Sequence, residues 1–189
     1  MFSPDHKPQL LVFAGPNGSG KSTVTRFQHI IGEYVNANKI KLAKGCSDLE
    51  AAQEAERIRE YLLAHQMDFT FETVLSTPRN LLLIQRAHDA GYSIRIIFIL
   101  TKDSSINVQR VADRVRKGGH DVPEEKIRSR YKKSLNNIRE LYKFVDDLYI
   151  FDNSGKAPVL ICSVRNRLLQ YYDNEQWEKK DVLKLFYPE

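Results

Sequence analysis

The feature that most constrains this chain is a glycine-rich segment, Gly15 to Ser22, which directly follows the apolar run Leu10–Ala14. It fits the pattern G-x-x-x-x-G-K-S/T, in which backbone N–H groups enclose nucleotide phosphates at the start of a helix. Lys21 would reach the β- and γ-phosphates, and the Ser22 hydroxyl would bind Mg²⁺. The alternative is a glycine-rich turn with a solvated lysine. We predict a site for ATP and Mg²⁺ formed by Gly15, Pro16, Asn17, Gly18, Ser19, Gly20, Lys21, Ser22 and Thr23.

Strand and helix patterns alternate along the 189 residues. We predict strands at residues 9–14, 34–36, 68–73, 92–100, 148–151 and 159–162. We predict helices at 19–31, 47–65, 78–90, 105–117, 123–145 and 176–185, with a polar connection between 36 and 47. This order, with the phosphate loop after the first strand, indicates a three-layer α/β fold with a mostly parallel central sheet and a helical lid. No linker or repeat interrupts it, so residues 1–189 are predicted to form a single domain.

The amino-acid composition limits the kinds of ligand and the cell compartment expected for this chain. Apolar residues make up 42% and charged residues 28%, as in ordinary globular domains. An anionic ligand such as a nucleotide would account for the net charge of +5, and without a Lys/Arg block there is little support for nucleic acid. Cys46 and Cys162 lack metal or redox spacing and are expected to be inert thiols in a reducing cytosol. No apolar run approaches the length of a membrane span, so we expect a cytoplasmic protein.

Two polar residues follow predicted strands, where a parallel sheet binds its ligands. Glu72 lies near the end of one strand and would coordinate Mg²⁺ through water, grip a sugar hydroxyl or act as a base. The alternative is a surface-facing Glu on an edge strand. Asn38 follows the strand 34–36, near the phosphate loop, and would orient a substrate hydroxyl. The alternative there is a turn built from asparagines.

A basic helix and a glycine hinge predict a lid at about residues 105–130. Arg110 and Arg114 are four residues apart and therefore share a helix face, and Arg130 lies in the next helix. Gly118-Gly119 between the helices would allow the arginines to close over the transferring phosphates. The alternative is a solvated cationic face.

Two further segments are weaker candidates. His120 would touch the ligand, or would serve as a local capping or packing group. Asp152-Asn153-Ser154 follows a late strand and would contact the adenine, or would form a plain Asx turn.

Taken together, these residues resemble the zeta toxin family of P-loop kinases, in particular its compact bacterial members, the zeta-toxin-like ATPases. The resemblance covers about residues 9–155. It rests, in chain order, on the phosphate loop, Val35-Asn36-Ala37, Phe71-Glu72-Thr73-Val74-Leu75-Ser76, Arg110 to Arg114 followed by Gly118-Gly119-His120-Asp121-Val122-Pro123-Glu124-Glu125, and residues 127–135 and 149–154. The Phe-Glu-Thr segment followed by the Gly-Gly-His-x-Val-Pro segment is its most specific part.

The resemblance implies a chemistry. It implies ATP-dependent phosphorylation of a sugar hydroxyl of UDP-N-acetylglucosamine or a related UDP-sugar, with a small antitoxin protein that blocks the ATP site. It also implies that Lys21 and Ser22 handle ATP and Mg²⁺ and that Glu72 contacts the substrate. Arg114 and Arg130, with Arg110, would stabilise the transferred phosphoryl group.

One position departs from the family pattern, which carries an Asp after the second strand as its expected base. This chain has Asn38, whose amide cannot accept the proton. Loss of a base lowers a rate by roughly 10²–10⁴-fold. Three explanations stay open: the Asp was replaced to make a toxic kinase harmless, Glu72 takes over, or the protein is now a weak kinase or a nucleotide switch.

The leading interpretation is therefore a cytoplasmic ATP- and Mg²⁺-dependent kinase of zeta toxin type. One alternative is a kinase for another small metabolite or for a polynucleotide end, which a basic track beside Glu72 would favour. The other is a nucleotide-binding module with weak ATPase activity, which Asn38 favours because fold and phosphate loop alone do not fix a function.

Overall fold

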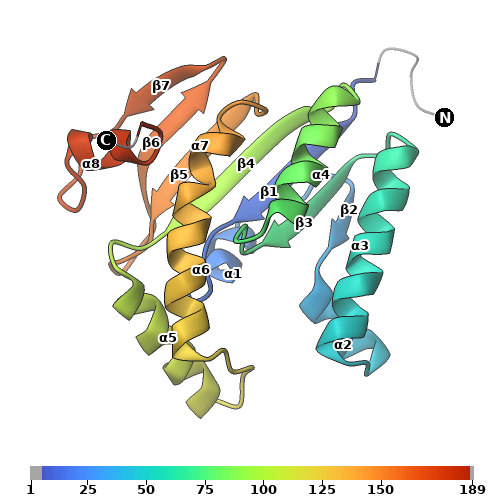
Figure 1. Cartoon of the computed structure of the whole chain (residues 1–189), viewed down its shortest axis with the longest axis horizontal. Coiled ribbons are helices and arrows are strands. Elements are labelled where there is room, and N and C mark those ends of the chain that lie inside the picture. Colours follow the sequence, from blue (N-terminus) through green and yellow to red (C-terminus); the bar gives the residue numbers. More distant parts are fainter. Residues whose placement is uncertain (1–5, 188–189) are drawn as a thin grey trace.

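In the computed structural model, which describes residues 6–187, one seven-stranded sheet organises the chain (Figure 1). Its strand order is β2-β3-β1-β4-β5-β6-β7. The strands are β1 (Gln9–Ala14), β2 (Glu33–Val35), β3 (Phe69–Thr73), β4 (Ser93–Leu100), β5 (Asp147–Asp152), β6 (Val159–Arg165) and β7 (Leu168–Tyr171). Strands β2, β3, β1, β4 and β5 run parallel, and β6 and β7 continue the sheet antiparallel. The predicted three-layer α/β fold with a mostly parallel sheet is confirmed.

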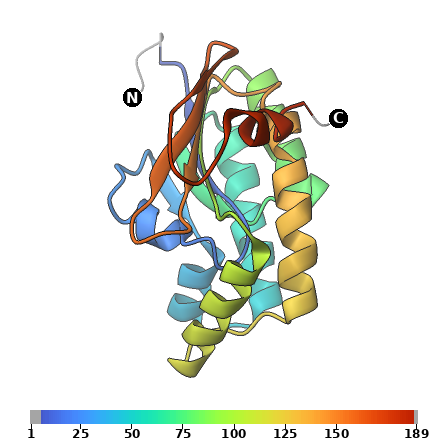
Figure 2. The same ribbon diagram turned by 90° about the vertical axis from the view of Figure 1, so that its left-hand side faces the viewer.

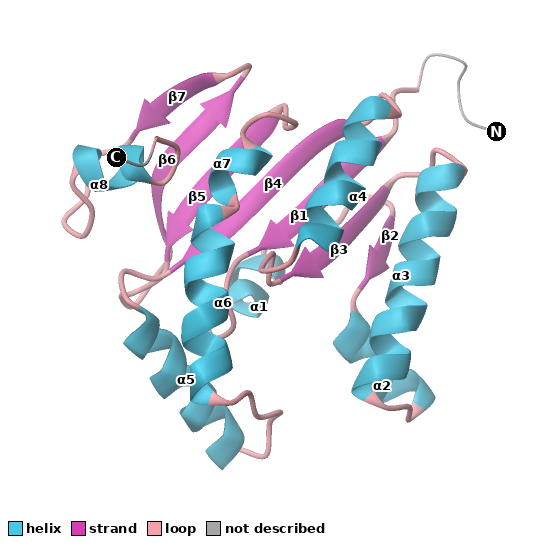
Figure 3. Cartoon of the chain, viewed as in Figure 1, coloured by secondary structure: helices cyan, strands magenta, loops and turns pink. Residues whose placement is uncertain are grey.

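Helices cover the two faces of the sheet unequally. The helices are α1 (Lys21–Thr25), α2 (Ala37–Lys44), α3 (Asp48–Ala64), α4 (Pro78–Asp89), α5 (Ser104–Arg116), α6 (Glu124–Asn136), α7 (Ile138–Leu141) and α8 (Lys179–Lys184). Figures 1 and 2 show α3, α4, α6 and α7 together on one face and α1 on the other. In Figure 3, α5 and α2 extend beyond the carboxyl ends of the parallel strands.

The buried core follows the two faces. Leu10 and Val12 of β1 join the larger cluster, which includes buried residues of α3, α4 and α7. Their neighbours Leu11 and Phe13 point to the opposite face and pack with Val24 of α1 in a smaller cluster. Side chains of a strand alternate between faces, so a strand that is buried on both sides is apolar throughout.

Several local signals in the sequence act as expected. Ser47 and Glu50 form a capping box at the start of α3, which satisfies backbone N–H groups that have no partner within the helix. Pro78 occupies the first turn of α4, where a missing N–H costs nothing. These residues fix the helix starts that the sequence predicts.

Two predictions near the phosphate loop are wrong. The helix predicted at 19–31 is only α1, because the β-branched run Thr23-Val24-Thr25 is a weak helix former and Phe27 N–H turns back to the Val24 carbonyl. The polar connection predicted at 36–47 contains α2. The Asn36 side chain caps this helix by accepting from the N–H groups of Asn38 and Lys39.

The later part of the chain differs from the prediction in the bounds of two helices and in one additional strand. The helix predicted at 123–145 ends at Asn136, and Asn137 turns its side chain to the Leu75 carbonyl (2.8 Å) before α7 begins. Strand β7 was not predicted, because Asn166 and Arg167 form its turn with φ of 50° and 64° without the usual glycine. The last helix, predicted at 176–185, is shorter and consists of α8 (Lys179–Lys184). Within residues 6–187, no helix combines the length and apolarity that a bilayer crossing needs.

Candidate active site

The phosphate loop connects β1 to α1 at the carboxyl edge of the sheet. The Gly15 N–H donates to the Thr73 carbonyl of β3 (3.2 Å), which ties the loop to the neighbouring strand. Gly20 has a φ of 88°, and a Cβ there would lie 2.1 Å from Asn153 Nδ2, so only glycine fits. The Ser19 hydroxyl is buried without a hydrogen-bond partner among the described residues. A loop of this shape, with an unsatisfied polar group, fits a bound phosphate.

Two asparagines outside the motif hold the loop in place. Asn153 Nδ2 donates to the Ser19 carbonyl (2.8 Å), and Asn107 Nδ2 donates to the Asn17 carbonyl (2.6 Å). The Asn107 side chain also accepts from the Thr101 hydroxyl, and the Thr101 carbonyl accepts from Tyr131 (2.6 Å). This chain of hydrogen bonds connects the loop to α5 and α6. Asn107 was not predicted, although an asparagine on the buried face of a helix is a signal for such a contact.

Lys21 is held against its own loop. Its Nζ donates to the carbonyls of Gly15 (2.7 Å) and Pro16 (3.0 Å). Burial lowers the pKa of Lys21 to about 8, the carboxylate of Glu72 acts in the opposite direction, and the guanidinium of Arg114 lowers it further. Lys21 therefore lies within electrostatic reach of both a carboxylate and a lid arginine.

This lowered pKa predicts how nucleotide binding depends on pH. Lys21 is charged below pH 8 and loses its proton above it, whereas bound phosphates would favour the charged form. Binding above pH 8 thus requires proton uptake, and we expect the affinity for a non-hydrolysable ATP analogue to fall roughly tenfold between pH 7 and pH 9. Calorimetry in two buffers of different ionisation enthalpy measures this uptake. Binding at pH 8 without proton uptake would contradict the expected change at Lys21.

Glu72 lies on β3 and accepts a hydrogen bond from Tyr34, a residue that was not predicted to belong to the site. The Tyr34 hydroxyl of β2 donates to Glu72 Oε1, and Asn36 Nδ2 donates to the Tyr34 oxygen (3.1 Å). Burial, and then the hydrogen bond to Glu72, raises the pKa of Tyr34 well above its usual range, so the phenol stays a donor. Tyr34 pairs with Thr70 across the strands, two residues before Glu72. Side chains two residues apart on a strand point to the same face, so the alternation along β2 and β3 is the sequence signal that could have indicated Tyr34.

A pocket of about 380 Å³ opens beside Glu72. Its walls are small side chains of α2 and α3, the segment that follows β3, and two arginines. The lining residues are Ala37, Ala52, Ala55, Arg59, Glu72, Thr73, Val74, Leu75, Ser76, Thr77, Asn80 and Arg130. The pocket therefore brings the carboxylate of Glu72 together with the predicted Arg130.

Asn38 lies elsewhere. It is exposed in the first turn of α2 and lines a second pocket of about 600 Å³, together with Asn17, Arg114 and His120. This pocket spans the space between α2 and the loop that joins α5 to α6. The two predicted groups Asn38 and Glu72 thus line different pockets.

The three predicted arginines have different surroundings. Arg130 Nη1 donates to Asn17 Oδ1 of the phosphate loop (3.4 Å). Arg114 Nη2 donates to the His120 carbonyl (2.7 Å) within the lid loop. Arg110 Nη2 donates to the Ser154 carbonyl (3.4 Å), beside the turn after β5. Arg130 and Arg114 therefore lie beside the phosphate loop, and Arg110 supports the turn.

The segment 152–154 forms the Asx turn that was one of its two interpretations. Asp152 accepts from the Ser154 N–H (3.2 Å) and from the Ser154 hydroxyl (2.7 Å). Its middle residue, Asn153, holds the phosphate loop as described above. His120 is exposed, and its ring lies 3.8 Å from Asp48 at the start of α3.

The residues present fit a magnesium ion that is bound mainly by phosphate. Within residues 6–187, no cluster of three or more His, Cys, Asp or Glu side chains is placed to hold a metal. Mg²⁺ does not need such a cluster, since it usually keeps waters and binds substrate phosphates. Ser22 is exposed in the first turn of α1, directly after Lys21, where its hydroxyl would complete the ligand set.

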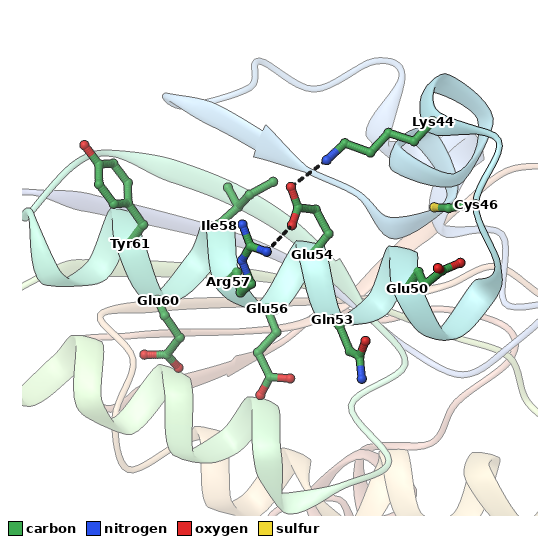
Figure 4. A pocket seen from close by; sticks show the side chains of 10 residues that line it. All are labelled: Lys44, Cys46, Glu50, Gln53, Glu54, Glu56, Arg57, Ile58, Glu60 and Tyr61. Carbon is green, nitrogen blue, oxygen red and sulfur yellow. Dashed lines mark hydrogen bonds and ion pairs between the residues drawn. The ribbon is translucent and has the colours of Figure 1, made fainter.

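A larger hollow of about 1060 Å³ lies along α3 and is separate from these residues. Figure 4 shows its charged lining, in which Glu54 pairs with Lys44 (2.6 Å) and with Arg57 (3.3 Å). No predicted site residue lines it. We therefore take the phosphate loop, and not this hollow, as the candidate active site.

Comparison with known proteins identifies the family. The zeta toxin family model matches residues 25–163 of this chain. The chain belongs to the zeta toxin family. The resemblance inferred from the motifs is thus confirmed, and the matched range begins just after the phosphate loop. An uncharacterised protein of Haemophilus influenzae is 25% identical over 129 residues, which cover 65% of this chain and 92% of that protein.

Solved structures share the fold at low sequence identity. In a crystal structure of the AvrRxo1-ORF1:-ORF2 complex, the matched chain has a TM-score of 0.71 and 16% identity over 96% of this chain. This zeta toxin family member spans 64% of that matched chain, which is less than two thirds of it. A chain from the PezAT chromosomal toxin-antitoxin system of Streptococcus pneumoniae has a TM-score of 0.60 and 15% identity, covering 99% of this chain and 81% of that one.

Proposed function

We propose that this member of the zeta toxin family is a kinase that transfers the γ-phosphoryl group of ATP to a sugar hydroxyl of UDP-N-acetylglucosamine or a related UDP-sugar. It would act in the cytoplasm as the toxin of a toxin–antitoxin pair. The observation that carries the proposal is that Arg130 lines the pocket beside Glu72 and also donates to Asn17 Oδ1 of the phosphate loop (3.4 Å), so the pocket adjoins the nucleotide site. A structure of the AvrRxo1-ORF1:-ORF2 complex with ATP and the PezAT toxin-antitoxin system lend support through the shared fold.

The phosphate loop provides the nucleotide site in this proposal. Lys21 leaves the carbonyls of Gly15 and Pro16 and turns to the β- and γ-phosphates, which replace those acceptors. Ser22 would hold Mg²⁺, which would neutralise charge on the phosphates. Ser19 gains the partner that its buried hydroxyl lacks within the described chain.

Glu72 is the proposed base. The acceptor hydroxyl lies in the pocket beside Glu72 and gives its proton to the carboxylate as its oxygen attacks the γ-phosphorus. The bond between that phosphorus and the bridging oxygen of ADP breaks at the same time, and ADP leaves. Tyr34 occupies Oε1 of the carboxylate, which orients Oε2 for the proton.

The helices α5 and α6 are the proposed lid of a single kinase domain. Their bases are fixed through Asn107 and Tyr131, whereas Arg114 and the glycines Gly118 and Gly119 lie at the far end. Closure would carry Arg114 from the His120 carbonyl to the transferring phosphoryl group and place it opposite Arg130. Arg110 would remain a support for the turn after β5.

A nucleotide-binding module with weak ATPase activity is the second candidate. One observation favours it: Asn38 lies at the position where the family pattern carries its base, and an amide cannot take up the proton. This candidate predicts saturable ATP binding with no phosphorylated product. The deciding experiment incubates the protein with ATP, Mg²⁺ and a panel of UDP-sugars and detects an added phosphate by mass spectrometry.

Replacing Lys21 with Ala is expected to abolish stabilisation by ATP. A ligand at about 100 times its Kd stabilises a protein by roughly 2.7 kcal/mol, and this gain should disappear when the phosphates lose their cation. Thermal unfolding with and without Mg²⁺-ATP measures it. Lys44→Ala is the matched control, because Lys44 pairs with Glu54 away from the loop. An unchanged ATP-induced shift in Lys21→Ala would refute the assignment of the loop.

A further inference from the structure

Arg59 of α3 is a residue of the Glu72 pocket that the sequence did not indicate. It lines this pocket together with Glu72 and Arg130. Its guanidinium lies over the ring of Phe71, 5.2 Å from the centroid, and its side chain is half-buried. The aromatic contact holds the cation at the wall of the pocket.

Among the described residues, the Arg59 guanidinium has no ion-pair partner, and its buried Nε has no hydrogen-bond acceptor. The neighbouring carboxylates are engaged by other arginines: Glu56 pairs with Arg79 (2.8 Å), and Glu60 pairs with Arg86 through two contacts of 2.6 and 2.9 Å. A half-buried guanidinium that lines a pocket without an ion-pair partner is placed to bind an external group.

The charged residues around the pocket indicate the charge of this external partner. Two guanidinium groups, Arg59 and Arg130, line it with one carboxylate, Glu72. Glu72 is already engaged by Tyr34, and Arg130 contacts the neutral amide of Asn17. Burial lowers the pKa of Arg59, and the carboxylates of Glu56 and Glu60 act in the opposite direction. An anion in the pocket would stabilise the guanidinium further.

We propose that Arg59 recognises an oxyanion of the acceptor, a phosphate or a carboxylate group, in the pocket beside Glu72. The inference deepens the proposed kinase function, because it defines the acceptor as a molecule with both a hydroxyl group and an oxyanion. Arg59 would bind the oxyanion while Glu72 takes the proton of the hydroxyl. Arg59 is thus a specificity residue that does not touch the transferred phosphoryl group.

The direct test observes the arginine itself. A buried Nε–H exchanges slowly with water, so its ¹H–¹⁵N resonance should be visible and is assigned by its loss in Arg59→Gln. The full chain is first saturated with a non-hydrolysable ATP analogue and Mg²⁺, which fills the phosphate loop. Inorganic phosphate and, separately, acetate are then added as probes. We expect a saturable shift of the Arg59 resonance, and the probe that causes it identifies phosphate or carboxylate as the preferred group.

Arg57→Gln is the matched control, because Arg57 lies on the same helix but is 80% exposed and reaches toward Glu54 (Figure 4). This variant should leave the shift of the Arg59 resonance unchanged. A titration in which Arg59 does not shift with either probe, or in which Arg57→Gln removes the shift, would overturn the proposal. The test requires no turnover, so it decides the role of Arg59 even if the kinase reaction is not observed.

Steady-state rates give a second readout. For an acceptor that is phosphorylated, Arg59→Gln should raise its KM roughly 10- to 100-fold, the value of hydrogen bonds to a charged group, and leave the KM of ATP unchanged. Arg59→Lys should recover part of the loss, since it keeps the charge but not the planar fork. Equal rises in both KM values would instead indicate a structural role and overturn the proposal.

Discussion

Replacing Glu72 with Gln is expected to lower the rate of phosphoryl transfer by roughly 10²–10⁴-fold while ATP binds almost as before. The substitution keeps the shape of the side chain and the oxygen that accepts from Tyr34, but the amide cannot take the proton of the acceptor hydroxyl. Single-turnover rates with saturating ATP measure the chemical step directly. Glu33→Gln, at the exposed start of β2, is the matched control and should keep the full rate.

The companion variant Asn38→Asp separates the two possible positions of the base. Asn38 lines the pocket at the lid loop and not the pocket beside Glu72, so a carboxylate there should change the rate little. The opposite pattern would contradict the role of Glu72: a full rate in Glu72→Gln, together with a large increase in Asn38→Asp. That pattern would instead support the position at which the family pattern carries an Asp.

Replacing Arg114 with Ala is expected to lower kcat by roughly 10³-fold or more, as removal of an arginine that stabilises a transferring phosphoryl group does. The affinity for ATP should change by only a few fold, because Arg114 now donates to the His120 carbonyl and would reach the phosphates only after closure. Its removal also eliminates a positive charge near Lys21, so the pKa of Lys21 should rise and the loss of ATP binding should move to higher pH.

Arg116→Ala is the control for this variant, because Arg116 lies near the end of the same helix, is 71% exposed and pairs with Asp113. It should retain kcat. Comparable losses of kcat and of ATP affinity in Arg114→Ala would mean that Arg114 binds the ground state as strongly as the transition state. Such a result would remove Arg114 from the proposed lid mechanism.

The sequence predicted those parts of the site that depend on local patterns. The phosphate loop, the strand that carries Glu72 and the basic helix each follow from contiguous residues, and the alternation of strands and helices predicted the sheet. The contacts of Tyr34, Asn107 and Arg59 depend on strand pairing and helix packing between distant segments. A single sequence contains these residues but not their neighbours, so their roles became apparent only in the fold.

Local propensity also explains the errors near the loop. The β-branched run Thr23-Val24-Thr25 shortens α1, although the motif before it predicts a full helix. The segment 36–47 was predicted as a polar connection, whereas the Asn36 side chain caps α2 there. In both cases a few residues decided between a helix and a turn, a difference that periodicity alone does not detect.

The short helix α1 contributes both to the phosphate loop and to the core. It carries Lys21 and Ser22 at its first turn, and with Val24 it also covers Leu11 and Phe13 on one face of the sheet. Any ligand that stabilises this first turn therefore also stabilises the cover of the smaller core cluster. In the free protein, this face should open more readily than the face under α3, α4 and α6. Bound nucleotide would then stabilise the packing on this face of the sheet. The nucleotide-free and nucleotide-bound states would differ in the local fluctuations of the core even where their average coordinates coincide.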